Sequence, residues 1–189
     1  MNRPVLTTRR LPAPLLLPYR AALYPFLAAR RFLTSLRPGP PWRTWITPRL
    51  LLGGFLVPGD AIQLARDGVA AVVDVSHELW APRRALAAAK SAYHRVPCWD
   101  LGAPSLDDAD RGVDFIAAAI RSGGRVHVHC GSGASRSVIV ALCYLGLHEG
   151  LDVEAALADI RRKRPCVAMR REQRSFVDRY LAWRCGPSA

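Results

Sequence analysis

The sequence predicts an α/β domain with a mostly parallel central sheet flanked by helices, preceded by a basic N-terminal arm. Short apolar runs alternate along the chain with longer segments that have the spacing of amphipathic helices, which is typical of parallel sheets with helical connections. The run at residues 70–75 (AAVVDV) has the apolar character of a strand buried on both faces. With 189 residues, 50% of them hydrophobic, the chain is long enough for one domain with a substantial core.

Four short apolar runs are expected to be the strands of this sheet. The first ends at the pair Gly53-Gly54, and the last, RVHVH, leads directly into a stretch of small residues. Each run is too short for a helix and is bounded by residues that favour turns. We expect strands at residues 50–52, 70–75, 93–96 and 125–129.

Six segments with helical periodicity and suitable capping residues predict helices. Asp60 can cap the N-terminus of the first, and Gly68 ends it. Ser105, three residues before Asp108, resembles a capping box, and Asp152 caps a later helix. We expect helices at residues 60–67, 80–92 (including a loop), 105–122, 135–148, 152–163 and 171–184.

The arm, residues 1–41, differs from the rest of the chain in charge and in proline content. The formal net charge is +12, yet residues 1–49 hold nine Arg and no Asp or Glu, whereas the other 140 residues hold 18 basic and 15 acidic residues. Nine of the 15 Pro also lie in residues 1–49. The chain therefore divides into this arm, a domain of nearly balanced charge at residues 42–184, and a tail at residues 185–189.

Proline is expected to limit helix formation within the arm. Pro12, Pro14 and Pro18 are expected to prevent a helix through its first part, whereas a helix is possible over residues 19–36, with a kink at Pro25. Arg lies among Leu, Phe and Tyr in this segment. We therefore expect binding to an anionic membrane surface or, without that role, a helix packed on the domain or a partly ordered tail. An organelle transit peptide ranks below both, because serine is scarce.

Composition argues against several classes of protein. No apolar run reaches the roughly 20 residues that a membrane-spanning helix needs. We expect no nucleic acid partner, because the domain itself is not strongly basic. The spacing of the five Cys does not match a disulfide framework, which favours free thiols in a reducing compartment. We expect a monomer in the cytoplasm, with peripheral membrane attachment or organelle targeting as alternatives.

The chemistry is expected in residues 125–147, RVHVHCGSGASRSVIVALCYLGL, where a strand leads into a loop of small residues and then an apolar helix. Such a loop can direct its backbone amides at an anion, and the helix N-terminus adds partial positive charge. Cys130 begins the loop and Arg136 ends it. This environment should lower the pKa of the thiol, and a planar guanidinium suits two oxygens of a phosphate. The pattern predicts a nucleophile facing a bound phosphoryl group.

The string HCGSGASRS, residues 129–137, resembles the Cys-x5-Arg loop of protein tyrosine phosphatases in the form found in the dual-specificity branch. The similarity extends over about residues 42–184, through WITPRLLLGGF, GVAAVVDVS, YHRVPCWDLGAPS and RRKRPCVAMRREQ. Within that branch the chain is most similar to small enzymes related to phosphatidylglycerophosphate phosphatase and to small bacterial members. The resemblance implies a protein tyrosine phosphatase-like fold and a phosphatase that needs no metal ion or other cofactor.

The resemblance also implies a role for each matching residue. Cys130 would form a cysteinyl-phosphate intermediate, and Arg136 would bind the phosphoryl oxygens in the transition state. Asp100 would protonate the leaving oxygen and later activate water. Ser137 would donate a hydrogen bond to the sulfur, and His129 would orient the loop and keep the thiol ionised. The phosphate-binding loop would consist of Gly131, Ser132, Gly133, Ala134, Ser135 and Arg136.

Alternatives remain for the acid and for a neighbouring thiol. Asp74, Asp107 and Asp108 compete with Asp100. The positions of Asp107 and Asp108 at a helix start are also explained by the helix dipole alone. Cys98 is either an ordinary thiol at a strand end or a redox partner of the catalytic cysteine.

Three further groups of polar residues have open interpretations. The run 161–164, together with Arg170 and Arg171, forms either a basic rim for an anionic substrate or a solvated helix end. His127 is expected to point away from the neighbouring His129 and to be a core residue. Gln173 matches a position that orients water or substrate in some related phosphatases.

The sequence thus predicts a phosphatase for phosphate monoesters, either phosphotyrosine, phosphoserine or phosphothreonine in proteins or a lipid monophosphate. Residues 131–135 contain no Lys or Arg, which weakens the case for polyphosphoinositides because related enzymes often place cations there. The alternatives are a catalytically weak phosphate-binding pseudophosphatase, a membrane adaptor, and a rhodanese-like sulfurtransferase. The Cys130, Arg136 and Asp100 set favours the phosphatase.

Overall fold

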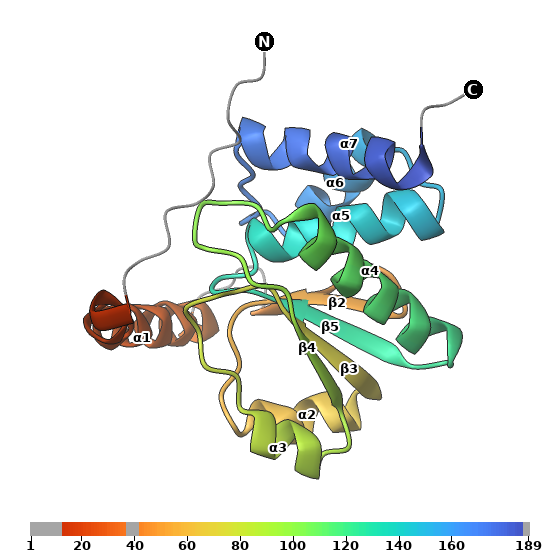
Figure 1. Cartoon of the computed structure of the whole chain (residues 1–189). Helices are drawn as coiled ribbons and strands as arrows, with labels where there is room; N and C mark the ends of the chain where they lie inside the picture. Colours follow the sequence, from red (N-terminus) through yellow and green to blue (C-terminus); the bar gives the residue numbers. More distant parts are fainter. Residues whose placement is uncertain (1–12, 37–41, 187–189) are drawn as a thin grey trace.

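The computed structural model describes residues 13–36 and 42–186 (Figure 1). Its strands are β1 (Arg43–Trp45), β2 (Leu50–Gly53), β3 (Val69–Asp74), β4 (Ala92–Arg95) and β5 (Arg125–His129). They form a five-stranded sheet in the order β1-β2-β5-β3-β4, in which β1 is antiparallel to β2 and every other pair is parallel. β5 therefore lies in the middle of the sheet, between β2 and β3. In open parallel sheets, ligands bind beyond the carboxyl ends of such central strands.

The helices are α1 (Ala13–Leu36), α2 (Asp60–Arg66), α3 (Arg83–Ala88), α4 (Leu106–Arg121), α5 (Arg136–His148), α6 (Val153–Lys163) and α7 (Arg171–Cys185). α2 and α3 cover one face of the sheet, and α4 to α7 cover the other (Figure 1). α1 lies to one side of these layers.

Two apolar cores hold the layers together. The larger lies between the sheet and α4 to α7, where Val128 of β5 packs with Ile139 of α5, both fully buried. The smaller lies between the sheet and α2 and α3 and contains Leu64, Val72 and Leu86. Val126 and Val128 anchor β5 in the larger core, which fixes the start of the loop that follows this strand.

The predicted fold class is confirmed, and each predicted strand and domain helix is present with small shifts of its ends. α3 is shorter than residues 80–92, because Pro82 stands at its N-terminus and Trp80 lies in the preceding loop. β1 was not predicted. Its three residues are too few to show a period, and pairing with β2 defines it.

The prediction for the start of the arm helix was wrong. α1 begins at Ala13, has Pro14 in its first turn and contains Pro18 and Pro25. A proline in the first turn lacks a backbone N–H, but an N–H at that position would have no partner within the helix in any case. Pro18 and Pro25 do remove internal hydrogen bonds, so contacts with the domain must offset that cost. The expectations for residues 1–12, 37–41 and 187–189 lie outside the described residues. Among residues 13–36 and 42–186, no helix combines the length and the apolar character that a membrane-spanning segment requires.

Candidate active site

The loop between β5 and α5 has its peptide carbonyls directed away from the centre of the loop. The amide of Phe55 donates to the carbonyl of Gly131 at 3.0 Å, and the amide of Ala168 donates to the carbonyl of Ala134 at 2.9 Å. The N–H and C=O of one peptide plane point in opposite directions. The amides of the loop are therefore left to converge on its centre, which makes an anion-binding cradle.

Arg164, directly after α6, holds the middle of the loop. Its Nε donates to the carbonyl of Gly133 at 2.8 Å and its Nη2 to the carbonyl of Ser132 at 3.0 Å, while Nη1 donates to Thr44 Oγ1 at 3.0 Å. The side chain is only 2% exposed. The run 161–164 therefore does not lie wholly on the surface, because Arg164 is buried and stabilises the loop through hydrogen bonds.

We expect replacement of Arg164 by lysine to weaken both stability and activity. One ammonium group keeps the charge but cannot reproduce the fork that bonds two carbonyls and a hydroxyl. The free energy of unfolding should fall by about 2 kcal/mol, because buried carbonyls lose partners. Urea denaturation and kcat/KM for p-nitrophenyl phosphate measure the two effects. Replacement of the exposed Arg161 by lysine is the matched control, and equal behaviour of the two variants would contradict the assigned role.

Gly133 is required by the shape of the loop. Its φ is +67°, in the left-handed region, and a Cβ at this position would lie 2.4 Å from the carbonyl carbon and oxygen of Gly53. The loop thus packs directly against the end of β2 with no room for a side chain.

Cys130 is the nucleophile candidate, and its surroundings favour the thiolate. Burial by itself raises the pKa of this thiol, but the charge of Arg136, the Ser137 hydroxyl and the amides of Ser137 and Gly133 outweigh burial and lower it. The Sγ atom lies 3.5 Å from Ser137 Oγ and the residue is 1% exposed. The expected cluster of Cys130, Arg136 and Ser137 is thus present.

Arg136 is buried and held on one side by a carboxylate that sequence analysis missed. Its Nη1 donates to Glu78 at 2.7 and 3.0 Å and to the carbonyl of Cys98 at 3.1 Å. Its Nη2 lies 3.1 Å from Asp100 Oδ1. Its Nε is buried with no hydrogen-bond partner among the described residues. Two edges of the guanidinium are therefore fixed, and a donor remains for an incoming oxyanion.

Asp100 lies at the rim of the site on a tight turn. Its side chain is 48% exposed and its carboxylate pairs with Arg136, so it is close to the cradle and accessible. Gly102 N donates to Trp99 O at 3.1 Å, and Leu101 between them has a φ of +64°. Gln173 Nε2 donates to the carbonyl of Gly102 at 2.8 Å. Gln173 thus ties this turn to α7.

The other candidate acids occupy positions that structural roles explain. Asp74 is fully buried and accepts hydrogen bonds from Tyr93 Oη at 2.8 Å and Arg95 Nη2 at 2.9 Å, which makes it an internal anchor. Asp108 donates its amide to Ser105 Oγ at 3.1 Å at the start of α4, as the capping pattern predicted. Asp107 is exposed in the same turn.

Cys98 differs from Cys130 in its ionisation. Burial raises the pKa of Cys98 to about 12 despite the opposing charge of Arg136, so its thiol is neutral near pH 7. All five cysteines are free thiols. In the structure Cys98 contributes to the site through its carbonyl.

The prediction that His127 and His129 face opposite ways was wrong. Their rings stack with centroids 5.4 Å apart, because residues two apart on a strand share a face. His129 Nδ1 lies 3.4 Å from the carbonyl oxygen of Cys130. Burial lowers the pKa of His129, which favours a neutral ring.

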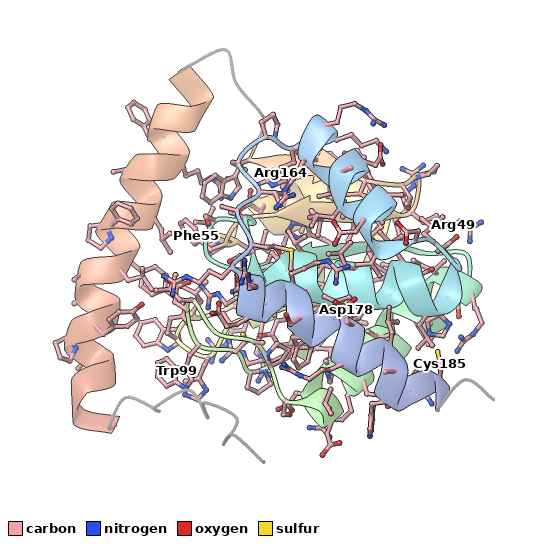
Figure 2. All side chains as sticks on the ribbon, turned by 90° about the horizontal axis from the view of Figure 1, so that it is seen from above. Arg49, Phe55, Trp99, Arg164, Asp178 and Cys185 are labelled. Atoms are coloured by element: carbon pink, nitrogen blue, oxygen red, sulfur yellow. The ribbon has the colours of Figure 1, made fainter. Side chains whose placement is uncertain are left out.

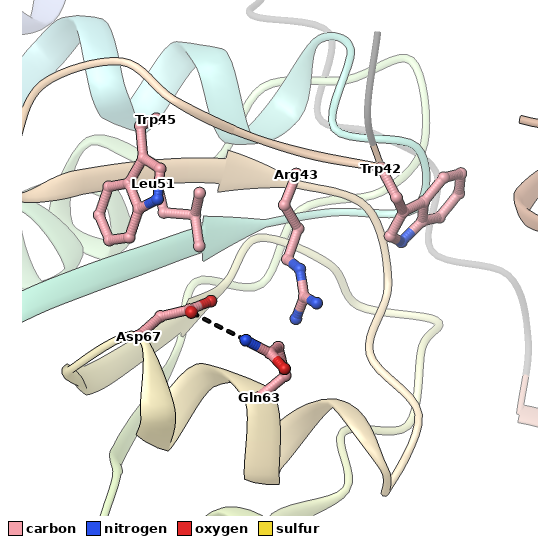
Figure 3. Close-up of a pocket in the computed structure, with 6 residues that line it drawn as sticks. All are labelled: Trp42, Arg43, Trp45, Leu51, Gln63 and Asp67. Atoms are coloured by element: carbon pink, nitrogen blue, oxygen red, sulfur yellow. Dashed lines mark hydrogen bonds between the residues drawn. The ribbon is translucent and has the colours of Figure 1, made fainter. Parts of the chain in front are cut away.

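A second concavity lies away from this loop. It has a volume of about 340 Å³ between β1, β2 and α2, with Trp42, Arg43 and Trp45 among its lining residues (Figure 3). Gln63 Nε2 donates to Asp67 Oδ1 at 2.9 Å on its α2 side. None of its lining residues belongs to the catalytic loop. Among the described residues no cluster of His, Cys, Asp or Glu could hold a metal ion.

The role of Ser137 can be tested through the pH dependence of Cys130 alkylation. A lowered pKa keeps Cys130 ionised to lower pH, and the rate of its alkylation falls as the pH drops through that value. Ser137→Ala removes a hydrogen bond to the thiolate, so the pH at which the alkylation rate falls should move to a higher value. Turnover should also slow about tenfold or more. The measurement is iodoacetamide labelling of the Cys130 peptide by mass spectrometry, with Ser122→Ala as control. An unchanged pH dependence of Cys130 alkylation in Ser137→Ala would contradict the assigned role of Ser137.

Comparisons with known proteins show the family to which the chain is related. The family model for "Dual specificity phosphatase, catalytic domain" matches residues 58–180. The chain is 31% identical over 164 residues to the Arabidopsis thaliana phosphatidylglycerophosphate phosphatase PTPMT2, covering 85% of this chain and 72% of that protein. It is 37% identical over 142 residues to Homo sapiens dual specificity phosphatase 28, covering 75% and 77%.

Solved structures share the fold. The crystal structure of human DUSP28 superposes with a TM-score of 0.68 at 31% identity, covering 79% of this chain and 99% of that one. The structure of PTPMT1 in complex with PI(5)P superposes with a TM-score of 0.71 at 23% identity, covering 77% and 99%. The loop described above and these matches together show that the chain belongs to the dual-specificity phosphatase family.

Proposed function

We propose that this phosphatase hydrolyses the terminal phosphate monoester of an anionic lipid, through a cysteinyl-phosphate intermediate. The observation that carries the chemistry is the Cys130 thiol, with its lowered pKa, in a cradle of amides beside the unpaired Nε of Arg136. A nucleophile, a charge clamp and an accessible acid are the parts that phosphoryl transfer to sulfur requires.

In the first step the Cys130 thiolate attacks phosphorus. The P–S bond forms as the bond from phosphorus to the leaving oxygen breaks, and Asp100 gives its proton to that oxygen so that a neutral alcohol departs. Arg136 and the loop amides bind the three equatorial oxygens, where charge gathers in the transition state. Glu78 and the Cys98 carbonyl orient Arg136 for this task.

In the second step water cleaves the intermediate. The Asp100 carboxylate takes a proton from the water as its oxygen attacks phosphorus, and the P–S bond breaks to return the Cys130 thiolate and inorganic phosphate. The Ser137 hydroxyl donates to the departing sulfur. For His129 we propose only the loop-orienting role, because a neutral ring adds no charge to the thiolate.

The arm and the relatives favour a lipid substrate. α1 carries Arg and no acid, and its side chains Leu17, Phe26 and Phe32 are each more than 60% exposed. A basic helix with exposed apolar residues is suited to an anionic membrane surface. Two Arabidopsis thaliana relatives are named phosphatidylglycerophosphate phosphatases.

A substrate panel tests this proposal. We expect the highest kcat/KM for phosphatidylglycerophosphate in vesicles, lower values for phosphoinositides, and the lowest for phosphotyrosine and phosphothreonine peptides. EDTA should leave every rate unchanged. A preference for phosphopeptides would overturn the lipid assignment, and loss of activity in EDTA would overturn the metal-free mechanism.

A further inference from the structure

α1 lies directly over the catalytic loop. Leu27 is 4% exposed and packs with Phe55 and Leu79, which form a small apolar cluster separate from the two cores of the domain. A Cβ built on Gly131, the residue after Cys130, would lie 3.8 Å from a Leu27 methyl carbon. Phe55 and Trp99 lie on the side of the domain that faces α1 (Figure 2). The helix thus rests on the mouth of the cradle.

Polar and aromatic contacts attach α1 on both sides of Leu27. Arg31 donates to both oxygens of Asp60, at 2.6 and 2.7 Å. Tyr24 hydrogen-bonds the backbone of Trp80, and its ring centroid lies 6.1 Å from that of Phe55 and 6.0 Å from that of Trp80. The apolar cluster around Leu27 is separate from the two cores of the domain, so displacement of α1 would leave those cores intact.

The charged groups of the site act electrostatically on Tyr19, in the N-terminal half of α1. Tyr19 is partly buried, and its pKa is raised by burial and then by the negative charges of Glu78 and Asp100, with Arg136 opposing. Tyr19 stands two turns before Leu27. α1 therefore places Tyr19 where the charges of Glu78, Asp100 and Arg136 act on it, and Leu27 beside Gly131. With α1 in place Cys130 is 1% exposed and Arg136 is 3% exposed.

The outer side of α1 fits a different partner. Phe26, next to the buried Leu27, is 61% exposed, as is Phe32. The sequence of α1 contains three Arg and no acid, so an anionic lipid surface would attract this helix. Anionic headgroups would compete with Asp60 for Arg31, so binding to a bilayer opposes the attachment of α1 to the domain.

We propose that α1 is a displaceable cover of the catalytic pocket and that an anionic lipid bilayer is the partner that removes it. The proposal rests on the proposed function, since it concerns access to that same site. A phosphoryl group carried by a lipid could then enter only where the membrane has taken up the helix. Such coupling lets one surface both supply the substrate and open the pocket.

The test uses the full chain, a soluble substrate and two readouts. Hydrolysis of p-nitrophenyl phosphate and alkylation of Cys130 by iodoacetamide are measured with no vesicles, with phosphatidylcholine vesicles, and with vesicles that contain phosphatidylglycerol. Anionic vesicles should raise both rates at least about tenfold, and phosphatidylcholine alone should not. Leu27→Ser should show the raised rates without vesicles, with little further stimulation. The double variant Phe26→Ser/Phe32→Ser should lose the stimulation.

Controls and opposite outcomes are distinct. Ile62→Ser, an exposed apolar position on α2 (61% exposed), should behave as the wild type. If Leu27→Ser does not fold, Arg31→Gln provides the second test, with a smaller increase. Unchanged alkylation in a folded Leu27→Ser variant, or inhibition by anionic vesicles, would overturn the cover. Equal stimulation by phosphatidylcholine would overturn the anionic partner. Faster alkylation with no hydrolysis in any sample would refute the proposed function and leave the cover standing.

Discussion

Replacement of Cys130 by serine is expected to abolish hydrolysis of p-nitrophenyl phosphate, with kcat lowered at least about 10⁴-fold. The fields that lower the pKa of the thiol, mainly Arg136 and the hydrogen bonds from Ser137, cannot ionise a serine hydroxyl near pH 7 because its pKa is far higher. The fold should be unaffected, since the two side chains are nearly equal in size.

The matched control for this variant is Cys185→Ser, at the exposed end of α7. Steady-state rates at several pH values and thermal denaturation of both variants complete the comparison. If Cys130→Ser kept even a few per cent of the wild-type kcat, attack by sulfur would be refuted and a direct attack by water would have to replace it.

Replacement of Arg136 by alanine should lower kcat/KM about 10³-fold or more, because the guanidinium binds the charge that develops on the phosphoryl oxygens. A second effect follows from burial. Glu78 is fully buried beside Arg136, and a carboxylate left there without that partner should lower the free energy of unfolding by about 3 kcal/mol.

The two effects can be separated with a double variant. Arg136→Ala/Glu78→Gln removes the buried carboxylate at position 78, so much of the lost stability should return in urea denaturation while activity stays low. Arg136→Lys keeps a charge but loses the planar fork, and should lie between alanine and the wild type in kcat/KM. Recovery of activity in the double variant would mean that Arg136 acts only through folding.

The centre of the site was predictable because its signals are local. Cys130, the small loop residues and Arg136 are contiguous, and the strand before them and the apolar helix after them have clear periodicity. Ser105 and Asp152 marked helix starts through contacts three residues away, and both caps are present in the structure. Local hydrogen bonds of this kind can be inferred without knowledge of the tertiary fold.

Other features depend on contacts between distant segments. Glu78 is 58 positions from Arg136 and Arg164 is 31 from Gly133, so neither role has a local sequence pattern. The beginning of α1 was mispredicted for a related reason: propensity disfavours Pro18 within a helix, whereas packing against the domain is a tertiary effect. For Gln173 the sequence suggests a position that orients water or substrate, whereas the structure shows its side chain bonded to the carbonyl of Gly102, in the turn that bears Asp100.

Crystals grown or soaked with vanadate test the central claim most directly. The account predicts vanadium bonded to Cys130 Sγ, its equatorial oxygens within about 3 Å of the loop amides and of Arg136 Nε, and an apical oxygen near Asp100. Vanadate bound elsewhere, with the sulfur turned out of the loop, would contradict the account.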